Sequence, residues 1–453
     1  MVLQSFRDPA GSVTVQPDRV LRLLNERGAL ELDAFLKSKV HKTLETSIVE
    51  TRPGETVPAA GGMAVEHPKI WFPSYPYEWP AEMLYSAAEL TLDLALQSLD
   101  EGWGLKDATP YNILFEGPKP IFVDICSFER RRAGDTVWQA YGQFMRTFVN
   151  PLIASRYHKL PIEALLLAAR DGIESEQLYR WTPRFKRYFD LLFLVTLPAM
   201  LAKRAGRIKT PDSAEVDPEQ AKWVVRRILK GLRKTLEKVR PHQIAHTRWS
   251  DYMQTFTYSK DQFEFKSRFV ENAITETRPR RTLDVGCNTG YFSKIAAQSG
   301  SRVIAIDRDP AVVGQLWKEA NAEKLDIQPL VADFARPTPA TGWRNAECSS
   351  FLARADRAFD MVLLLGTLHH LSVTDRVPVS EVLDQAASVA GHAVIEFVGP
   401  GDEMFKLLAR GNEDLYRDYT PAAFEQACQA RFELVRSAQV PNSHRRLYLL
   451  RRR

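Results

Sequence analysis

The chain has 453 residues, of which 45% are hydrophobic and 26% are charged. These values are those of an ordinary globular protein, so they exclude a wholly disordered chain and leave room for about three domains. The formal net charge of +5 is local, because residues 203–240 carry 12 basic and 5 acidic side chains and residues 444–453 carry five arginines without an acid. The rest of the chain is net negative, which excludes a uniformly basic surface for a polyanion.

The four cysteines lie far apart and form no CxxC pair. Their spacing argues against a structural zinc site or a disulfide framework, so we expect reduced thiols, no bound metal and a cytoplasmic protein. We also expect no secretory signal, because the first residues lack an apolar core. The most apolar run, residues 191–202, is 12 residues long and contains Pro198. A membrane-spanning helix needs about 20 residues, so this run predicts a buried helix.

The N-terminal part, residues 1–202, is expected to be a mainly helical domain. Residues 1–75 show no single pattern, whereas 81–99 and 138–202 repeat apolar side chains at helical spacing. Between them, residues 112–125 contain two short apolar runs separated by a turn, which predicts a β-hairpin.

Residues 203–248 are expected to form a basic helical linker. Its lysines and arginines are interpreted as the solvated face of a helix, and contact with nucleic acid is the alternative. Its apolar residues fall on one helical face: Val225, Ile228, Leu229, Leu232, Leu236 and Val239.

Residues 249–453 alternate apolar strands with helical patterns. This alternation predicts an α/β domain with a doubly wound, mostly parallel sheet. Residues 432–440 and 446–450, joined by a turn, predict a C-terminal antiparallel hairpin.

A glycine-rich turn, residues 283–290 (LDVGCNTG), follows the first strand of this domain and opens a helix. Gly286 and Gly290 allow a close backbone approach to a ligand and a positive φ. Asn288 stands where a third glycine is frequent, and asparagine tolerates the left-handed conformation better than other residues with a side chain. The turn also occurs in dinucleotide-binding domains, so it is not decisive alone.

Two acids follow the turn at the ends of the next strands. Asp307 ends the second strand, where a carboxylate accepts hydrogen bonds from both hydroxyls of a ribose. Asp333 ends the third strand and precedes Phe334. A carboxylate there accepts a hydrogen bond from the exocyclic amine of adenine, while the Phe334 ring packs against the base. For each acid alone, a helix cap or a loop acid is an equal alternative.

The glycine turn, the two acids and the closing hairpin, in this order, resemble the class I S-adenosylmethionine-dependent methyltransferases. The resemblance implies S-adenosyl-L-methionine as cofactor and a Rossmann-like sheet. It also implies that Asp284 holds the amino end of the methionine moiety. The other residues that it assigns to the cofactor are Gly286, Asn288, Gly290, Asp307, Asp333, Phe334 and Gly366.

The fourth strand ends at Gly366 and is followed by His369 and His370. It carries neither an N/D-P-P-Y motif nor a Pro-Cys nucleophile, which disfavours methylases of DNA bases. A histidine here is able to take a proton from an acceptor hydroxyl. We therefore predict His370, then His369, as catalytic bases, with Glu396 at the end of the fifth strand as a further candidate. The alternative is that they only wall the pocket, because methyl transfer needs little beyond correct placement.

A second constellation lies in the N-terminal part. Asp107, Asn112 and Asp124 follow the order of catalytic base, metal-binding amide and metal-binding acid in protein kinases. However, Leu105 replaces the usual histidine, Ile-Cys follows Asp124, and no glycine loop or strand lysine is evident upstream. The domain is therefore interpreted as a possibly degenerate kinase-like lobe, with ordinary turn acids as the alternative.

From about residue 70 to the end, the chain resembles a bacterial family related to the rhizobial host-specific nodulation methyltransferases. We therefore predict a methyltransferase that acts on a hydroxyl of a small molecule, glycan or lipid. The alternatives are an RNA methyltransferase and a bifunctional or ATP-sensing protein. The segments that carry the resemblance include PSYPYEW at 73–79, LKDATPYNILF at 105–115, PIFVDICSFE at 120–129, FVNPL at 148–152 and IEFVGPGD at 395–402.

Overall fold

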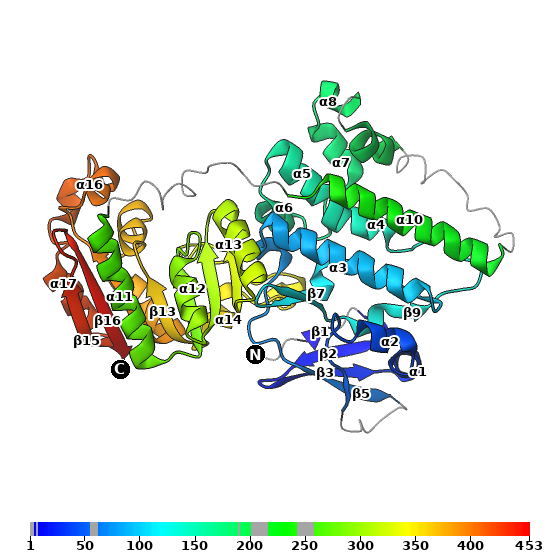
Figure 1. Ribbon diagram of the computed structural model, residues 1–453, viewed down its shortest axis with the longest axis horizontal. Coiled ribbons are helices and arrows are strands. Elements are labelled where there is room, and N and C mark those ends of the chain that lie inside the picture. Colours follow the sequence, from blue (N-terminus) through cyan, green and yellow to red (C-terminus); the bar gives the residue numbers. More distant parts are fainter. Residues whose placement is uncertain (1–3, 6–7, 55–61, 189–190, 201–215, 242–257) are drawn as a thin grey trace. The chain divides into compact units, whose positions relative to one another are not determined.

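The computed structural model describes residues 4–5, 8–54, 62–188, 191–200, 216–241 and 258–453 (Figure 1). The chain divides into two compact units, the first formed by Met1–His242 with Gly342–Cys348 and the second by Gln243–Thr341 with Ser349–Arg453. The domain boundaries predicted at 202/203 and 248/249 lie outside the described residues and stay predictions.

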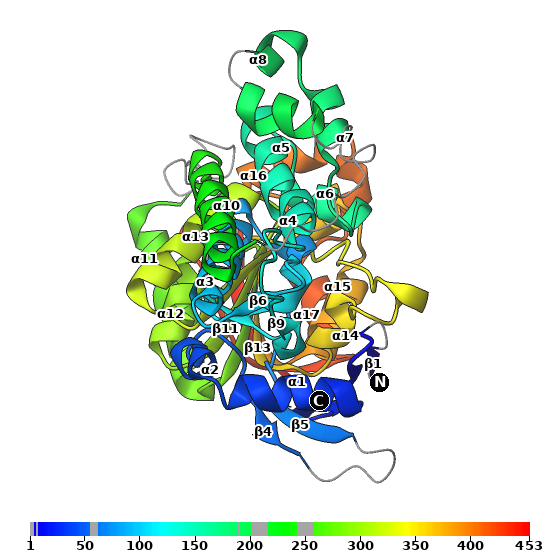
Figure 2. The same ribbon diagram turned by 90° about the vertical axis from the view of Figure 1, so that its right-hand side faces the viewer.

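The first unit begins with a five-stranded antiparallel sheet, of order β1-β2-β3-β5-β4, that the sequence did not predict. Helices α1 (Glu26–Leu36) and α2 (Lys39–Leu44) lie between β3 and β4 in the chain, and α1 packs on the sheet (Figure 2). The strands are β1 (Gln4–Ser5), β2 (Gly11–Val15), β3 (Arg19–Leu24), β4 (Arg52–Pro53) and β5 (Met63–Pro68). Most side chains of β2 and β3 are only partly buried.

The helix and the hairpin predicted next are confirmed. Helix α3 (Ala81–Leu99) buries most of its side chains, and β7 (Ile113–Glu116) pairs antiparallel with β8 (Lys119–Phe122). Strand β6 (Trp103–Leu105) pairs with β9 (Phe128–Arg130). The helical region expected after residue 138 consists of α4 (Tyr141–Phe144), α5 (Asn150–His158), α6 (Ile162–Ala168), α7 (Ser175–Trp181), α8 (Arg184–Tyr188) and the π-helical turns η4 (Met145–Val149) and η5 (Leu192–Thr196). Three short 3-10 turns are η1 (Pro76–Glu78), η2 (Pro110–Asn112) and η3 (Ile125–Ser127).

The apolar run at 191–202 is not buried on all sides, in contrast to the prediction. Within its described part, residues 191–200, Leu191 and Val195 are buried, whereas Phe193 is 73% and Met200 47% exposed. The run therefore buries only one face. None of the helices that the structure describes has the length and apolar character needed to cross a membrane.

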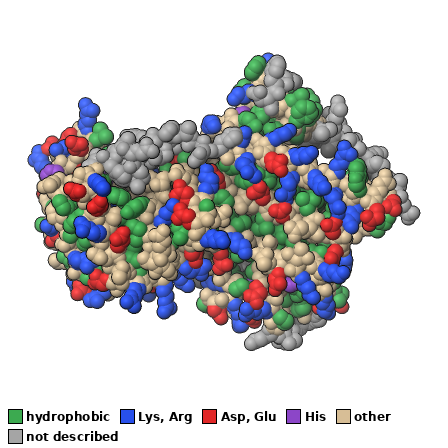
Figure 3. Space-filling model, viewed as in Figure 1, with side chains coloured by type: hydrophobic (Ala, Val, Ile, Leu, Met, Phe, Trp, Pro, Cys, Tyr) green, Lys and Arg blue, Asp and Glu red, His purple; other side chains and the backbone are tan. Residues whose placement is uncertain are grey.

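The basic stretch forms helix α10 (Pro218–Lys238), which packs along α3 (Figure 1). The predicted apolar face is confirmed: it is buried except for Ile228, which is partly buried. Arg226 pairs with Asp100 and Arg233 with Asp93, so α3 neutralises part of the basic charge. In the view of Figure 3, Lys and Arg side chains alternate with Asp and Glu over both units.

The second unit has the predicted architecture. Its seven-stranded sheet has the order β12-β11-β10-β13-β14-β16-β15, parallel from β12 to β14 and closed by an antiparallel hairpin. The strands are β10 (Arg281–Val285), β11 (Arg302–Asp307), β12 (Ile327–Val331), β13 (Phe359–Leu364), β14 (Ala390–Val398), β15 (Phe432–Gln439) and β16 (Arg445–Arg452). The helices are α11 (Lys260–Thr277), α12 (Tyr291–Gln298), α13 (Pro310–Glu323), α14 (Phe351–Ala355), α15 (Val379–Val389), α16 (Glu403–Ala409) and α17 (Pro421–Cys428), with the turns η7 (His370–Thr374) and η8 (Glu413–Tyr416). One further turn, η6 (Trp343–Asn345), belongs to the segment grouped with the first unit.

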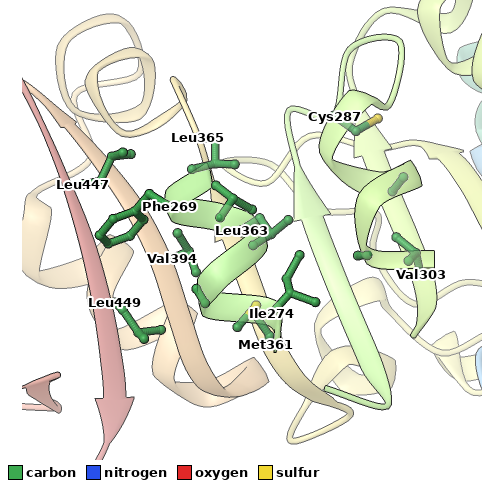
Figure 4. Packing of buried hydrophobic residues seen from close by; sticks show 14 of the residues in the cluster. Phe269, Ile274, Cys287, Val303, Met361, Leu363, Leu365, Val394, Leu447 and Leu449 are labelled. Atoms are coloured by element: carbon green, nitrogen blue, oxygen red, sulfur yellow. The ribbon is translucent and has the colours of Figure 1, made fainter. Parts of the chain in front are cut away.

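The core of the second unit lies between α11 and the sheet. Phe269 and Ile274 of α11 belong to one buried cluster with Met361 and Leu363 of β13 and Val394 of β14 (Figure 4). Central strands of a parallel sheet are covered on both faces, which explains why β13 and β14 are almost continuously apolar. This rigid sheet fixes the positions of the loops at its carboxyl edge.

Candidate active site

A cavity of about 490 Å³ lies in the second unit at the carboxyl edge of the parallel strands. Its wall includes residues that follow β10, β11, β12 and β13. The sheet order reverses between β10 and β13, and ligands of doubly wound sheets bind at such a reversal. The volume lies within the range of about 300–1,000 Å³ that is common for small-molecule sites.

Most of the predicted site residues meet in this cavity. Those that line it are Gly286, Asn288, Asp307, Asp333, Phe334, Gly366 and His370. Those that do not line it are Asp284, Gly290, His369 and Glu396.

The glycine turn adopts the backbone conformation expected from the sequence. Gly286, Asn288 and Gly290 have φ values of +69°, +50° and +79°, so the left-handed conformation predicted for Asn288 is confirmed. A Cβ atom on Gly286 would lie 2.2 Å from Cγ2 of Thr367. The turn therefore has no room for a side chain at this position.

Asp307 ends β11 with both carboxylate oxygens held by the backbone. Its Oδ2 accepts from the N–H of Asn288 at 2.9 Å, and its Oδ1 accepts from the N–H of Asp309 at 3.0 Å. Burial raises the pKa of Asp307, although these two N–H groups oppose the shift. The N–H of Arg308 is a third backbone donor to this carboxylate, so about one of its four acceptor positions remains for a ligand hydroxyl.

Asp333 belongs to a network of charges that the sequence did not reveal. Its Oδ2 lies 2.9 Å from Nη1 of Arg336, whose Nη2 lies 2.5 Å from Oδ1 of Asp375. Nη1 of Arg308 lies 3.8 Å from Oδ2 of Asp333 and 3.9 Å from Oδ2 of Asp375. Asp375 also lines the cavity, reached through the π-helical turn η7, and no periodic pattern in the sequence marks it.

Asp284 lies beneath the glycine turn. Its carboxylate is buried and accepts a hydrogen bond of 2.6 Å from Oγ of Ser293. Burial raises the pKa of Asp284 to about 6. Its assignment to the methionine moiety stays a prediction.

The two histidines after β13 differ in environment. His370 lines the cavity, whereas His369 is completely buried and neither of its ring nitrogens has a partner among the described residues. Burial, with the nearby His370 and Arg445, lowers the pKa of His369 well below its ordinary value. His369 is therefore neutral at pH 7. The ring centroids of His369 and His370 are 4.3 Å apart.

Glu396 is buried in a cluster of charges next to the cavity. Its Oε2 lies 2.7 Å from Nζ of Lys266, its Oε1 lies 3.5 Å from Nη1 of Arg445, and it accepts from the hydroxyl of Tyr258. Burial opposes its ionisation, but the charges of Lys266 and Arg445 lower the pKa of Glu396 to about 2. Nε of Arg445 also lies 2.7 Å from Oδ2 of Asp402.

Lys266 and Tyr258 line the cavity, and the sequence analysis did not identify Lys266. A signal was present, because Lys266 lies three residues after Phe263 and four before Val270, on the buried stripe of α11. Nζ of Lys266 also lies 5.2 Å from the centre of the Phe292 ring. Of the aromatic residues Trp249, Tyr252, Phe256 and Tyr258, which precede α11 in the chain, only Tyr258 is among the described residues.

Comparison with known proteins agrees with this geometry. A family model described as a methyltransferase domain matches residues 283–392. Nodulation protein NoeA of Rhizobium meliloti (strain 1021) is 30% identical over 459 residues, which cover 100% of this chain and 96% of that protein.

Two solved structures are also similar. The bifunctional kinase-methyltransferase WbdD has 16% sequence identity and a TM-score of 0.33, over 46% of this chain and 43% of that chain. The N-methyltransferase NodS from Bradyrhizobium japonicum WM9, in complex with S-adenosyl-L-homocysteine, has 14% identity and a TM-score of 0.32, over 43% and 89% of the respective chains.

The relationship to NoeA extends over nearly the whole of both chains. The methyltransferase domain model covers the glycine turn, the acids after the second and third strands, and the histidines after the fourth. The chain therefore belongs to the family of nodulation protein NoeA, and its second unit is a class I methyltransferase that uses S-adenosyl-L-methionine.

Proposed function

We propose that this methyltransferase modifies a hydroxyl group of a small molecule, a glycan or a lipid, with His370 as the base. The observation that carries the proposal is the contrast among the three predicted bases. His370 lines the cavity, His369 is buried away from it, and Glu396 is held as an ion by Lys266 and Arg445. A base must lie within reach of the proton that it removes, which favours His370.

The residues of the cavity fit S-adenosylmethionine, which supplies a methyl group on a positively charged sulfur when bound. Asp307, at the end of β11, lines the cavity and is assigned to the ribose hydroxyls. Asp333 and Phe334 are assigned in the same way to the adenine. The same cavity is lined by three residues whose φ values are positive, Gly286, Asn288 and Gly366. Larger side chains at the two glycines would take up space that the ligand needs.

His370 accepts the proton that the acceptor hydroxyl loses as its oxygen becomes methylated. The remaining requirement is placement of that oxygen, which supplies much of the rate in a reaction with a good leaving group. Aromatic side chains in the wall exclude water from the acceptor and offer apolar surface to a sugar or an acyl chain. They are Tyr258, Phe263, Tyr291 and Phe292.

Three of the five arginines in residues 444–453 are paired with acids, which favours this acceptor class over RNA. Arg445 is bound to Asp402, Arg446 to Glu425 and Arg451 to Glu433. Guanidinium groups that are paired within their own chain offer less charge to phosphates.

The test is transfer of labelled methyl from S-adenosylmethionine into a host extract that is afterwards separated into lipid, glycan, RNA and protein. We expect label in the lipid or glycan fraction. His370→Gln is expected to remove this label without changing cofactor affinity measured by calorimetry, whereas His392→Gln, on strand β14 outside the cavity, serves as the matched control. Label in RNA would support the alternative, and label that persists in His370→Gln would exclude His370 as the base.

A further inference from the structure

The first unit contains a group of polar residues that methyl transfer does not use. Nδ2 of Asn112 lies 3.2 Å from Oγ of Ser127, which donates to Oδ2 of Asp124 at 2.5 Å. Asp107 lies close enough to Asp124 for the two carboxylates to interact. Asp107, Asn112 and Asp124 are all partly exposed, so a ligand from solution is able to reach them.

Backbone hydrogen bonds hold the two loops that carry these residues. The N–H of Lys106 donates to the carbonyl of Ser127 at 2.9 Å, and the N–H of Val123 donates to the carbonyl of Asn112 at 2.8 Å. The acid, the amide and the second acid are therefore fixed relative to each other before any ligand binds. Such preorganisation is typical of binding sites.

Arg22 of strand β3 faces this group. Its Nη2 lies 3.0 Å from Oδ1 of Asp124, and its Nη1 lies 3.4 Å from Oδ2 of Asp8, in the connection between β1 and β2. The Arg22 side chain is only 8% exposed, and its Nε has no hydrogen-bond partner among the described residues. A buried guanidinium N–H without a partner is costly, and a phosphate oxygen would satisfy it.

The charges of the site do not balance. The carboxylates of Asp8, Asp107 and Asp124 surround two cations, Arg22 and Lys106. Like charges that share one site repel each other. A divalent cation would relieve this repulsion.

The order of the chemical groups along this unit resembles that in protein kinases. An antiparallel sheet of five strands has helices between its third and fourth strands, and Arg22 lies on the third. The loop with Asp107 and Asn112, the β7–β8 hairpin and Asp124 follow in the chain. Protein kinases place a cationic residue on the third strand and bind magnesium through an amide and an acid in this order.

We propose that the first unit binds a magnesium–nucleoside triphosphate at this site. Asn112 and Asp124 would hold Mg²⁺, and Arg22 would contact phosphate oxygens in place of Asp8. The described residues contain no cluster of three or more acids, histidines or cysteines suited to a metal. Mg²⁺ needs no such cluster, because it binds one or two protein ligands together with phosphates and water. The proposal is limited to binding, since Ile125 and Cys126 follow Asp124 where active kinases have Phe-Gly.

The test uses the full chain with ATP as the probe, in MgCl₂ and in EDTA, measured by calorimetry. We expect Mg²⁺-dependent binding that S-adenosylhomocysteine does not displace. Hydrogen exchange of the unaltered protein should show that Mg²⁺–ATP protects β3 and residues 105–128. Tripolyphosphate with Mg²⁺ separates the two sources of affinity, because equal affinity for it would mean that only the phosphates are recognised.

Arg22→Gln and Asp124→Asn should each weaken ATP binding by about tenfold or more, since each removes a charge-assisted contact. The matched control is Arg19→Gln, on the same strand, whose partner is Glu66 at 3.1 Å. Retained hydrogen-exchange protection of α3 would show that a variant is folded. Binding that persists in both variants, binding that is independent of Mg²⁺, displacement of ATP by S-adenosylhomocysteine, or no protection in the unaltered protein would each overturn the proposal.

Discussion

Nζ of Lys266 and Oε2 of Glu396 form an ion pair of 2.7 Å in which the side chains are 7% and 0% exposed. The pair joins α11, which precedes the sheet in the chain, to β14, an interior strand of the sheet. Removing two charges from water is costly, and the cost is offset only when both are paired and hydrogen-bonded. Arg445 and Tyr258 supply the additional contacts here.

Lys266→Met should destabilise the second unit by about 3 kcal/mol, because it leaves the Glu396 carboxylate buried with fewer partners. The double variant Lys266→Met/Glu396→Gln should lose less than the sum of the single variants. The measurement is urea unfolding, following the transition that S-adenosylhomocysteine shifts.

The control for this prediction is Lys294→Met. Lys294 also forms an ion pair of 2.7 Å, with Glu319, but the two side chains are 22% and 36% exposed. Exposed pairs contribute about 1 kcal/mol or less. Equal losses at Lys266 and Lys294 would contradict the role assigned to burial.

Asp307→Asn should weaken S-adenosylhomocysteine binding by about tenfold or more, because a charged acceptor of two hydroxyl groups becomes a neutral one that accepts through a single oxygen. Calorimetry gives the affinity directly. Asp326→Asn is the control, since Asp326 pairs with Arg302 at the opposite edge of the sheet. Unchanged affinity in Asp307→Asn would show that the ribose assignment is wrong.

Gly286→Ala should destabilise the second unit for two separable reasons. A left-handed alanine costs about 1–2 kcal/mol, and the new methyl group would overlap Cγ2 of Thr367. Adding Thr367→Ser removes this Cγ2 atom, so thermal unfolding should show partial recovery, with only the backbone cost remaining. Full recovery would mean that the backbone at residue 286 relaxes without strain.

Stability should depend on pH through Asp284, whose pKa is raised by burial from 3.8 to about 6. The folded state then holds its proton more tightly than the unfolded state, so the stability gained from protonation is complete below about pH 4 and is lost as the pH rises through about 6. Asp284→Asn removes this loss. Its stability relative to the unaltered protein should rise by about 2 kcal/mol between pH 4 and pH 7, as measured by urea unfolding. Parallel curves would contradict the buried, titrating Asp284.

The sequence was sufficient for the second unit where the pattern is local. Its strands are continuous apolar runs with a helix after each, and this period is visible without any structure. The conformation of Asn288 was also predictable, because few residues other than glycine tolerate a positive φ. The small sheet of the first unit was not predictable, since its strands of two to six residues are held by neighbours distant in the chain.

Some residues at the site carried too weak a local signal. Asp375 reaches the cavity only through the fold of η7, and Glu396, which was predicted as a base, is held as an ion by Lys266 and Arg445. The two partners of Glu396 lie 130 and 49 residues away in the chain. No spacing rule relates such distant positions.

The length and charge of the chain excluded a disordered chain and a uniformly basic surface. The strand pattern, the glycine turn, the strand-end acids and the closing hairpin pointed to a methyltransferase sheet, because these features depend on local conformation and on hydrogen-bonding chemistry. Only the tertiary structure decided which polar side chains reach the cavity and which are buried against an opposite charge. It also brought Arg22 to Asp124 across about one hundred residues. Burial and pairing depend on what surrounds a side chain in three dimensions, and these two properties decide whether a charge can take part in chemistry.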